Sequence, residues 1–274
     1  MKEVLRRYPA LHRTAAYGYH SVLDLADFAM RRDQDLPPRR LRFIGNGDFR
    51  QVGADFVAHA ADLAGLRPGD RVLDVGCGIG RIAIPLTGYL DDDGSYEGFD
   101  VVPRGIEWCR RHITPAHPNF RFQLADIRND EYNPGGRQRP EDYRFPYDDN
   151  EFDVAILTSV FTHLLPSTVR RYVAELERVL KPGGRCLATY FLLSDETRRL
   201  AAEGAALSEF PYEGDGYATT NPAIPEEAIA FEESTVRQLH ADAGLPIESV
   251  FHGAWSGRDE YLSGQDVCIA RKPG

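Results

Sequence analysis

The sequence contains few cysteines, and none of them is spaced as a metal ligand or as part of a disulfide framework. The four cysteines, at positions 77, 109, 186 and 268, are widely separated and form no C-x-x-C pair. That scatter argues against a zinc site and against a disulfide scaffold. The eight histidines also lack the spacing of a metal-binding motif. We therefore expect no bound metal and a reducing, cytoplasmic location.

Long apolar runs are absent as well. No run approaches the roughly 20 residues that a membrane-spanning helix needs. The first residues, MKEVLRRYPALHR, lack the uninterrupted apolar segment of a signal peptide. Acidic residues exceed basic ones by 42 to 32, which gives a net charge of −10. Because this charge opposes contact with a phosphate backbone, we expect neither membrane nor nucleic acid as a partner.

The sequence does contain a regular alternation of apolar strands and amphipathic helices. Strands are expected at 71–75, 95–100, 120–126, 152–159 and 185–192, and the helices between them at about 79–89, 104–112 and 167–180. Before the first strand, a helical period beginning near Gln51 places five apolar residues on one face: Val52, Phe56, Ala60, Leu63 and Ala64.

The C-terminal part predicts a different arrangement of strands. A helix at 234–243 is followed by strand-like runs at 247–255 and 266–272, and a short link between them suggests an antiparallel pair. The whole pattern predicts an α/β fold with a Rossmann-like doubly wound sheet. The sheet is expected to be mostly parallel, covered on both faces, with an antiparallel C-terminal strand and a cap insertion.

Three segments depart from this alternation. Residues 1–45 are predicted to be an N-terminal helical extension or lid, with a helix at 21–30, and residues 46–274 to be the main domain. Residues 128–150 and 193–232 are too long for simple connections and are expected to be insertions. The second is interpreted as a cap over the ligand site, with a loose surface excursion as the alternative. Asn46, between two glycines, suggests a lid over the cofactor.

The stretch VLDVGCGIGR at 72–81 is the clearest ligand-binding motif. It reads as a buried strand that ends in a glycine-rich turn, and the following helix would direct free N–H groups at a ligand. A dinucleotide fingerprint, G-x-G-x-x-G, requires its third glycine where this chain has Arg81. An NAD-dependent oxidoreductase is therefore kept only as a remote alternative.

Five motifs in order resemble a class I S-adenosylmethionine (SAM)-dependent methyltransferase. They are VLDVGCGIG, the acid closing YEGFD, the LAD at 124–126, FDVAILTSVFTHL at 152–164 and VLKPGG at 179–184. The resemblance covers about residues 50–192 and 234–272. It implies SAM as the cofactor and an enzyme that transfers its methyl group.

The resemblance also implies roles for individual residues. Asp74 would organise the glycine loop and help to bind the amino-acid part of SAM, Asp100 would accept from both ribose hydroxyls, and Asp126 from the adenine amino group. Arg81 would pair with the SAM carboxylate, or would be an exposed helix arginine. The expected cofactor-binding residues are Asp74, Gly76, Cys77, Gly78, Gly80, Arg81, Asp100, Val101, Asp126, Ile127, Thr158 and Ser159.

His163 is the candidate for the chemical step. It follows the fourth strand at the carboxyl edge of the sheet, and an imidazole suits proton transfer near neutral pH. A positioning role and a structural role remain as alternatives. Tyr190 is interpreted as a strand aromatic. Seven aromatic residues of the insertions either build a substrate pocket or form the core of the cap: Tyr132, Tyr143, Phe145, Tyr147, Phe210, Tyr212 and Tyr217.

These observations predict a methyltransferase that acts on a small molecule. A hydroxyl acceptor is favoured, with a sugar or glycan precursor as an example, because the site offers a base. The proline-proline-tyrosine signature of amino-group methylation on nucleic acids or proteins is absent from the fourth strand, which ends in LTSV. N- or C-methylation of a small metabolite, a non-catalytic SAM-binding module and a homodimeric state remain open.

Overall fold

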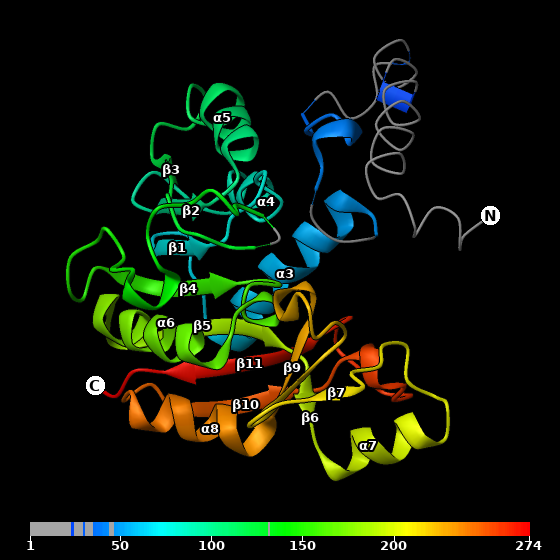
Figure 1. Ribbon diagram of the computed structural model, residues 1–274. Helices are drawn as coiled ribbons and strands as arrows, with labels where there is room; N and C mark the ends of the chain where they lie inside the picture. The colour runs from blue at the N-terminus through cyan, green and yellow to red at the C-terminus, as the bar shows by residue number, and fades with distance from the viewer. Residues whose placement is uncertain (1–22, 25–29, 31–34, 44–46, 131) are drawn as a thin grey trace.

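The computed structural model describes residues 23–24, 30, 35–43, 47–130 and 132–274. Their central feature is a seven-stranded sheet with the order β10-β11-β5-β4-β1-β2-β3 (Figure 1). The strands are β1 (Arg71–Val75), β2 (Ser95–Asp100), β3 (Phe120–Leu124), β4 (Phe152–Leu157), β5 (Leu180–Tyr190), β10 (Ile247–Phe251) and β11 (Asp266–Arg271). β1 to β5 are mutually parallel, and β11 is antiparallel to both of its neighbours. The predicted Rossmann-like fold is confirmed.

The strand order reverses beside β1, and this reversal positions the site. β1 pairs with β2 on one side and with β4 on the other, so that Asp74 lies opposite both Gly98 and Ile156. After β1 the chain forms β2 and β3 on one side of β1, and it then forms β4 and β5 on the other side. In open α/β sheets, the crevice outside the carboxyl ends of the strands at such a point is where ligands bind.

Helices cover both faces of the sheet because successive strand residues point to opposite sides. Leu73 packs in the core beneath α6 and α8, whereas its neighbour Val72 packs in the core beneath α3 and α5. The helices are α3 (Phe49–Ala64), α4 (Ala83–Leu86), α5 (Pro103–His112), α6 (Pro166–Val179), α7 (Asp195–Ala202) and α8 (Glu233–Asp242).

Helix α3 begins and ends at residues that satisfy its terminal backbone groups. The Asp48 carboxylate accepts from the Gln51 N–H at the start, and Gly65 adopts a left-handed conformation at the end. In its middle, α3 approaches the turn before α4 so closely that a Cβ on Gly53 would lie 2.2 Å from the Arg81 carbonyl oxygen. Only glycine fits this position without a shift of backbone.

The predicted helix at 79–89 is much shorter than expected. The residues before Ala83 form turns, and α4 ends at Leu86. Pro85 has no N–H and cannot complete a helical bond to the Arg81 carbonyl, which interrupts the ladder at this point. Turns replace the expected helix here. In one of them the Gly80 N–H donates to the Cys77 carbonyl oxygen.

Several strand boundaries also differ from the expected ones. β3 and β4 each end two residues before the predicted positions 126 and 159, and β5 begins at Leu180 rather than at 185. β4 cannot continue to residue 159 because Ser159 has a φ of 58°, which is not extended backbone. The link between β10 and β11 spans residues 252–265 and includes a 3₁₀ turn, so it is not short.

The first expected insertion takes the place of a helix between β3 and β4. It contains a 3₁₀ turn (Pro140–Asp142), and Tyr143, Phe145 and Tyr147 are buried in the core beside α6. These aromatics cover sheet surface that a crossover helix would otherwise cover. They are therefore part of the main core rather than of a substrate pocket.

The second expected insertion has its own sheet, with the order β6-β9-β8-β7. Its strands are β6 (Leu192–Leu193), β7 (Tyr212–Glu213), β8 (Tyr217–Thr219) and β9 (Ile229–Glu232). The buried carboxylate of Asp266 attaches its base to the main sheet, because it accepts from Leu192 N, Gly253 N and Trp255 Nε1 at 2.7–2.8 Å. Phe210 packs on Trp255 with ring centroids 5.6 Å apart.

The expected helix at 21–30 and the lid hypothesis centred on Asn46 fall mainly outside the described residues. The division of the chain at residue 45 therefore stays a prediction. Among the helices of the described ranges, none has the length and apolar character required to cross a membrane.

Candidate active site

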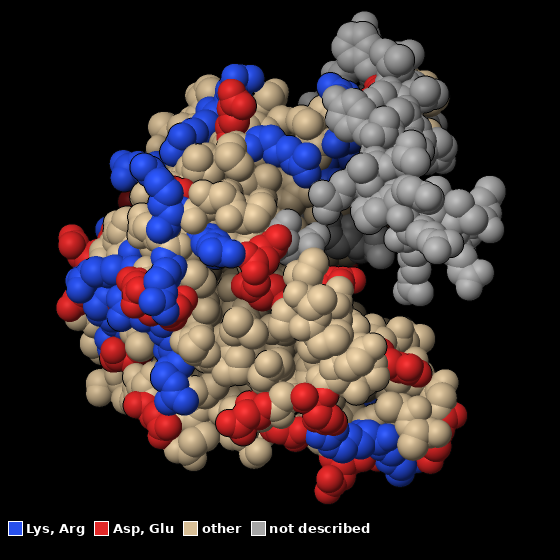
Figure 2. Space-filling view, in the orientation of Figure 1, with Lys and Arg blue, Asp and Glu red and all other residues tan. Residues whose placement is uncertain are grey.

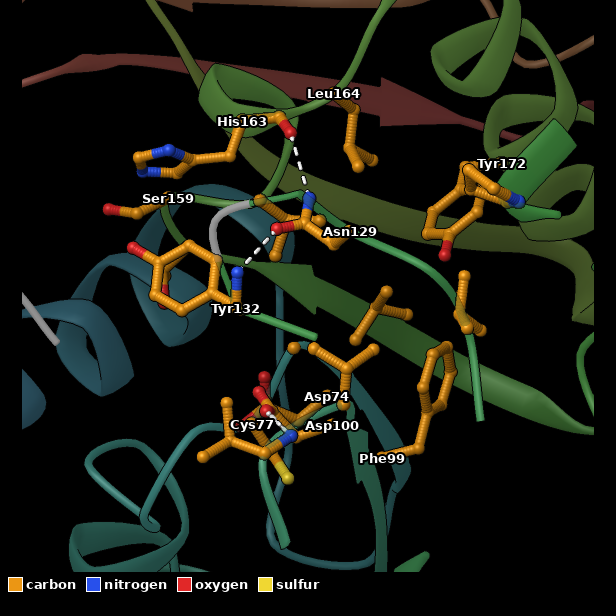
Figure 3. Close-up of a pocket in the computed structure, with 18 of the residues that line it drawn as sticks. Asp74, Cys77, Phe99, Asp100, Asn129, Tyr132, Ser159, His163, Leu164 and Tyr172 are labelled. Carbon is orange, nitrogen blue, oxygen red and sulfur yellow. Dashed lines mark hydrogen bonds between the residues drawn. The ribbon is translucent and has the colours of Figure 1, made fainter. Parts of the chain in front are cut away.

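A cavity of about 230 Å³ lies at the carboxyl ends of β1, β2 and β4 (Figure 3). In the view of Figure 3, Asp74, Cys77 and Asp100 lie toward one side, whereas His163, Ser159 and Tyr132 lie toward the other. The predicted site residues that line it are Asp74, Gly76, Cys77, Arg81, Asp100, Val101, Ile127, Thr158, Ser159 and His163. Gly78, Gly80 and Asp126 are not among the described residues of the lining.

The glycine loop takes a path that other residues would not follow easily. Gly76, Gly78 and Gly80 have φ values of 74°, 58° and 84°, in the left-handed region. A Cβ on Gly76 would lie 2.5 Å from a Val160 methyl carbon, so this glycine also lets β1 meet the segment after β4. Gly80 lies against Cys109 of α5 and against Ile113, which follows α5. It therefore packs against this helix and does not line the cavity.

Asp100 joins the glycine loop to the end of β2. One carboxylate oxygen accepts from Gly78 N at 2.8 Å and the other from Val102 N at 2.8 Å. Burial raises the pKa of this carboxyl to about 6, against the opposing effect of these backbone donors. Each oxygen has a second lone pair, so the group can accept two further bonds from a ligand diol.

Asp74 is fully buried and only partly satisfied. Its Oδ2 accepts from the Tyr96 hydroxyl at 2.6 Å, whereas Oδ1 has no hydrogen-bond partner within the described part of the chain. Burial raises the pKa of Asp74 to about 7. An unsatisfied carboxylate oxygen in a cavity is suited to a ligand that brings a cation or a donor.

Arg81 is buried, with 8% of its surface exposed, so the alternative of an exposed helix arginine is excluded. Burial lowers the pKa of Arg81, and the nearby Asp74 opposes that shift. Its Nε is buried and has no hydrogen-bond partner within the described part of the chain. The cavity thus holds a buried carboxylate and a buried guanidinium, each with an unsatisfied atom.

Asp126 lies away from the cavity. Its carboxylate accepts from the backbone and side chain of Arg137, and the hydrogen bond to that guanidinium lowers the pKa of Asp126. Its side chain is 35% exposed. The neighbouring Ile127 does line the cavity. Adenine recognition by Asp126 stays a prediction, and it requires Arg137 to give up part of this pairing.

His163 lies in a 3₁₀ turn (Phe161–His163) that follows β4. Its Nδ1 is 2.9 Å from the Glu226 carbonyl oxygen. Because a carbonyl oxygen only accepts, Nδ1 carries the proton and Nε2 is the acceptor of the neutral ring. The centroids of the His163 and Tyr132 rings lie 5.6 Å apart in an edge-to-face arrangement. Figure 3 shows the two residues on the same side of the cavity. The second insertion therefore orients this histidine through Glu226.

The lining also contains residues that the sequence did not single out. Asn129 donates toward the His163 carbonyl and the Glu226 carboxylate at 3.4 Å each, and accepts from Tyr132 N at 2.8 Å. Gln265 comes from the link before β11. Of the seven aromatics considered for a pocket, Tyr132 is the one that lines this cavity.

Tyr190 is interpreted correctly as a strand aromatic. It is fully buried, stacks on Phe161 with ring centroids 4.8 Å apart, and its hydroxyl lies 2.9 Å from His240 Nε2. The described residues that line the cavity do not include it.

Part of this chain is similar in sequence to known methyltransferases. Residues 72–184 match the family model described as a methyltransferase domain. Phosphoethanolamine N-methyltransferase 3 of Arabidopsis thaliana is 29% identical over 57% of this chain, and a phthiotriol/phenolphthiotriol dimycocerosates methyltransferase of Mycobacterium tuberculosis is 36% identical over 52%. The aligned regions cover only 28% and 44% of those two proteins.

The fold has solved counterparts too. The magnesium protoporphyrin IX methyltransferase of Synechocystis PCC 6803, a structure with bound S-adenosylhomocysteine (SAH), superposes with a TM-score of 0.53. It is 16% identical, and the match covers 93% of this chain and 98% of that one. The fold of the described residues is the one that class I SAM-dependent methyltransferases share, and residues 72–184 within it match a methyltransferase domain.

Substitution of Asp100 tests the cofactor side of the cavity. Asp100→Ala removes two acceptors for ligand hydroxyls, and hydrogen bonds to a charged group contribute about 1.5–3 kcal/mol. We expect the Kd for SAH, measured by calorimetry, to rise at least about tenfold. Asp92→Ala, at an exposed loop position, serves as the control and leaves the Kd unchanged. An unchanged Kd for Asp100→Ala would contradict a ribose-binding role.

The pKa of Asp74 predicts a specific pH dependence of stability. Because burial raises it from 3.8 to about 7, the folded protein binds more protons than the unfolded chain between these values. Stability therefore falls as the pH rises through this window. Asp74→Asn removes this loss, so the Tm of the variant minus that of the parent increases from about pH 5 to about pH 8. A Tm difference that stays constant with pH would show that Asp74 is already ionised at the lower pH.

Proposed function

We propose that the protein transfers the methyl group of SAM to a small-molecule acceptor, with a hydroxyl as the favoured accepting group. The observation that carries this proposal is the composition of one cavity. Among the described residues, Asp74, Arg81 and Asp100 offer unsatisfied or spare polar atoms to a cofactor, and the lining also includes His163, whose Nδ1 lies 2.9 Å from the Glu226 carbonyl oxygen. The residues proposed for cofactor binding and for the chemical step line the same cavity.

The polar groups of the cavity fit the parts of SAM. The buried Asp74 oxygen would accept from the SAM ammonium, the Arg81 guanidinium would pair with the SAM carboxylate, and Asp100 would accept from the ribose diol. Val101 and Ile127, which line the cavity, would flank the adenine ring. When bound, SAM supplies a methyl group already activated on a sulfonium, with a neutral thioether as the leaving group.

The protein's own residues then act on the acceptor. The cavity aligns the hydroxyl oxygen with the methyl carbon, and such alignment removes much of the entropic barrier to reaction. His163 Nε2 takes the hydroxyl proton as the new carbon–oxygen bond forms. The Glu226 carbonyl holds the ring in this tautomer and stabilises the imidazolium that results.

N-methylation of a small metabolite is the second candidate. One relative that matches about half of this chain is named as an N-methyltransferase. The same cavity would serve an amine, and His163 would again remove a proton. C-methylation and a non-catalytic SAM-binding module are further alternatives that the activity test separates.

A small-molecule acceptor agrees with the charge of the protein. On the face drawn in Figure 2, basic side chains gather over α5, β3 and the segment before β4, with acidic side chains among them. The protein as a whole has a net charge of −10. A nucleic-acid partner is therefore not part of the proposal. A cytoplasmic location, a homodimer and a capping role for residues 193–232 stay predictions.

Transfer of a labelled methyl group tests the proposal directly. The purified protein is incubated with methyl-labelled SAM and a fractionated extract of the source cells. We expect label in a small, polar fraction, and alkali-stable ether product would identify a hydroxyl acceptor. Label in protein or RNA would contradict the acceptor class. SAH binding without label in any fraction would favour the non-catalytic module.

The role of His163 is tested with the labelled fraction as substrate. His163→Gln can still donate to the Glu226 carbonyl but cannot act as a base, so we expect kcat to fall by about 10² to 10⁴. The Kd for SAH stays unchanged. His112→Gln, an exposed change on α5, is the matched control. A kcat within a few-fold of the parent value would exclude the base role.

A further inference from the structure

Ser159 has an unusual backbone conformation at the edge of the cavity. Its φ is 58°, and among the described residues Asn150 is the other non-glycine residue with a positive φ. Asparagine tolerates this region through its short polar side chain, whereas for most other residues it costs about 1 kcal/mol or more. Such strain persists only where the surroundings hold it in place.

Two hydrogen bonds hold Ser159 in this conformation. Its N–H donates to the Thr189 hydroxyl oxygen at 2.7 Å, and its own hydroxyl donates to Gln265 Oε1 at 3.1 Å. Thr189 is fully buried on β5, and its hydroxyl donates to the same Gln265 oxygen at 2.6 Å. The three residues connect the end of β4, the end of β5 and the link before β11.

This network fixes which way the Gln265 amide faces. The Thr189 hydroxyl oxygen accepts from Ser159 N, and the hydroxyl donates to the Gln265 carbonyl oxygen. Both lone pairs of this oxygen are then used. The remaining polar group of Gln265 is its NH₂, which forms no hydrogen bond within the described part of the chain, and Gln265 lines the cavity.

The amide group lies on the acceptor side of the cavity. Ser159 lies next to the His163 ring in Figure 3, on the side opposite Asp74 and Asp100. A donor at this place, with its orientation set by two hydrogen bonds, suits an acceptor atom of the substrate, such as a carbonyl or carboxylate oxygen. A hydroxyl substrate with a neighbouring carbonyl or carboxylate oxygen has this chemistry.

We propose that Gln265 is a specificity-determining residue, whose side-chain N–H groups donate to a carbonyl or carboxylate oxygen next to the methyl-accepting group. Ser159 and Thr189 are positioning residues that act through Gln265. The inference rests on the proposed methyltransferase function and deepens it, because it names a chemical feature of the substrate. It also explains why the strained conformation of Ser159 is maintained at this edge of the cavity.

The test compares the parent protein with Gln265→Glu in the labelled-methyl assay, with the same cell extract. A glutamate oxygen can still accept from Ser159 and Thr189, but the second oxygen presents an acceptor where the NH₂ was. We expect label in the product fraction to fall at least tenfold, while the Kd for SAH changes by less than twofold. The labelled product should contain a carbonyl or carboxylate group. Gln138→Glu, an exposed position, is the matched control.

The pH profile separates recognition from a structural effect. A protonated glutamic acid has an O–H donor, so the activity ratio of Gln265→Glu to the parent should rise as the pH falls from about 7.5 to about 5. Thr189→Val removes the bond that orients the amide, and should raise KM more than it lowers kcat. If Gln265→Glu fails to bind SAH, Gln265→Met takes its place in the assay. The methionine side chain has a similar length and no amide group.

Each outcome decides the inference. Equal labelling by the parent and by Gln265→Glu or Gln265→Met overturns it and leaves the proposed function intact. A product without a carbonyl or carboxylate oxygen also overturns it. If the parent binds SAH but labels no fraction, the proposed function fails, and this inference fails with it.

Discussion

The buried carboxylate of Asp100 is the contact on which the architecture of the site depends. It accepts backbone bonds from the glycine loop after β1 and from Val102 after β2, so two separate loops take their shape from one side chain. A carboxylate away from water is stable only with such donors. Each carboxylate oxygen keeps one lone pair for a ligand after it has accepted its backbone bond. The same side chain can therefore hold the two loops and bind a ligand. The neighbouring Asp74 has one carboxylate oxygen without a hydrogen-bond partner among the described residues.

Sequence patterns predicted the parallel strands well because each strand is short, apolar and bounded by a turn signal. β1 and β2 have the expected limits, and the glycine loop, Asp100 and His163 meet at one edge of the sheet. This success follows from a general property of parallel sheets, whose carboxyl ends lie together. Local patterns failed where a single residue changes the backbone path. Pro85 shortens the helix after the glycine loop, and the positive φ of Ser159 ends β4 early.

The remaining site residues depend on contacts between distant parts of the chain. Gln265 reaches the cavity because β11 returns antiparallel to β5, and no local signal marks it. The Arg137 pairing of Asp126 likewise arises from how the segment after β3 folds back. The aromatics of that segment were ambiguous for a physical reason, since a buried ring suits a core and a pocket equally. Tyr143 and Phe145 lie in the core and Tyr132 in the cavity, although all three come from one insertion.

The contact between Gly53 and the Arg81 carbonyl has a mechanical consequence. No side-chain atom separates α3 from the turn that carries Arg81, so the two backbones touch without a compressible layer between them. Close-packed interiors transmit displacement rather than absorb it. A shift of α3 along or across its axis therefore displaces the backbone of Arg81, whose side chain lines the cavity. The position of α3 and the geometry of the cavity are therefore coupled through the backbone contact at Gly53.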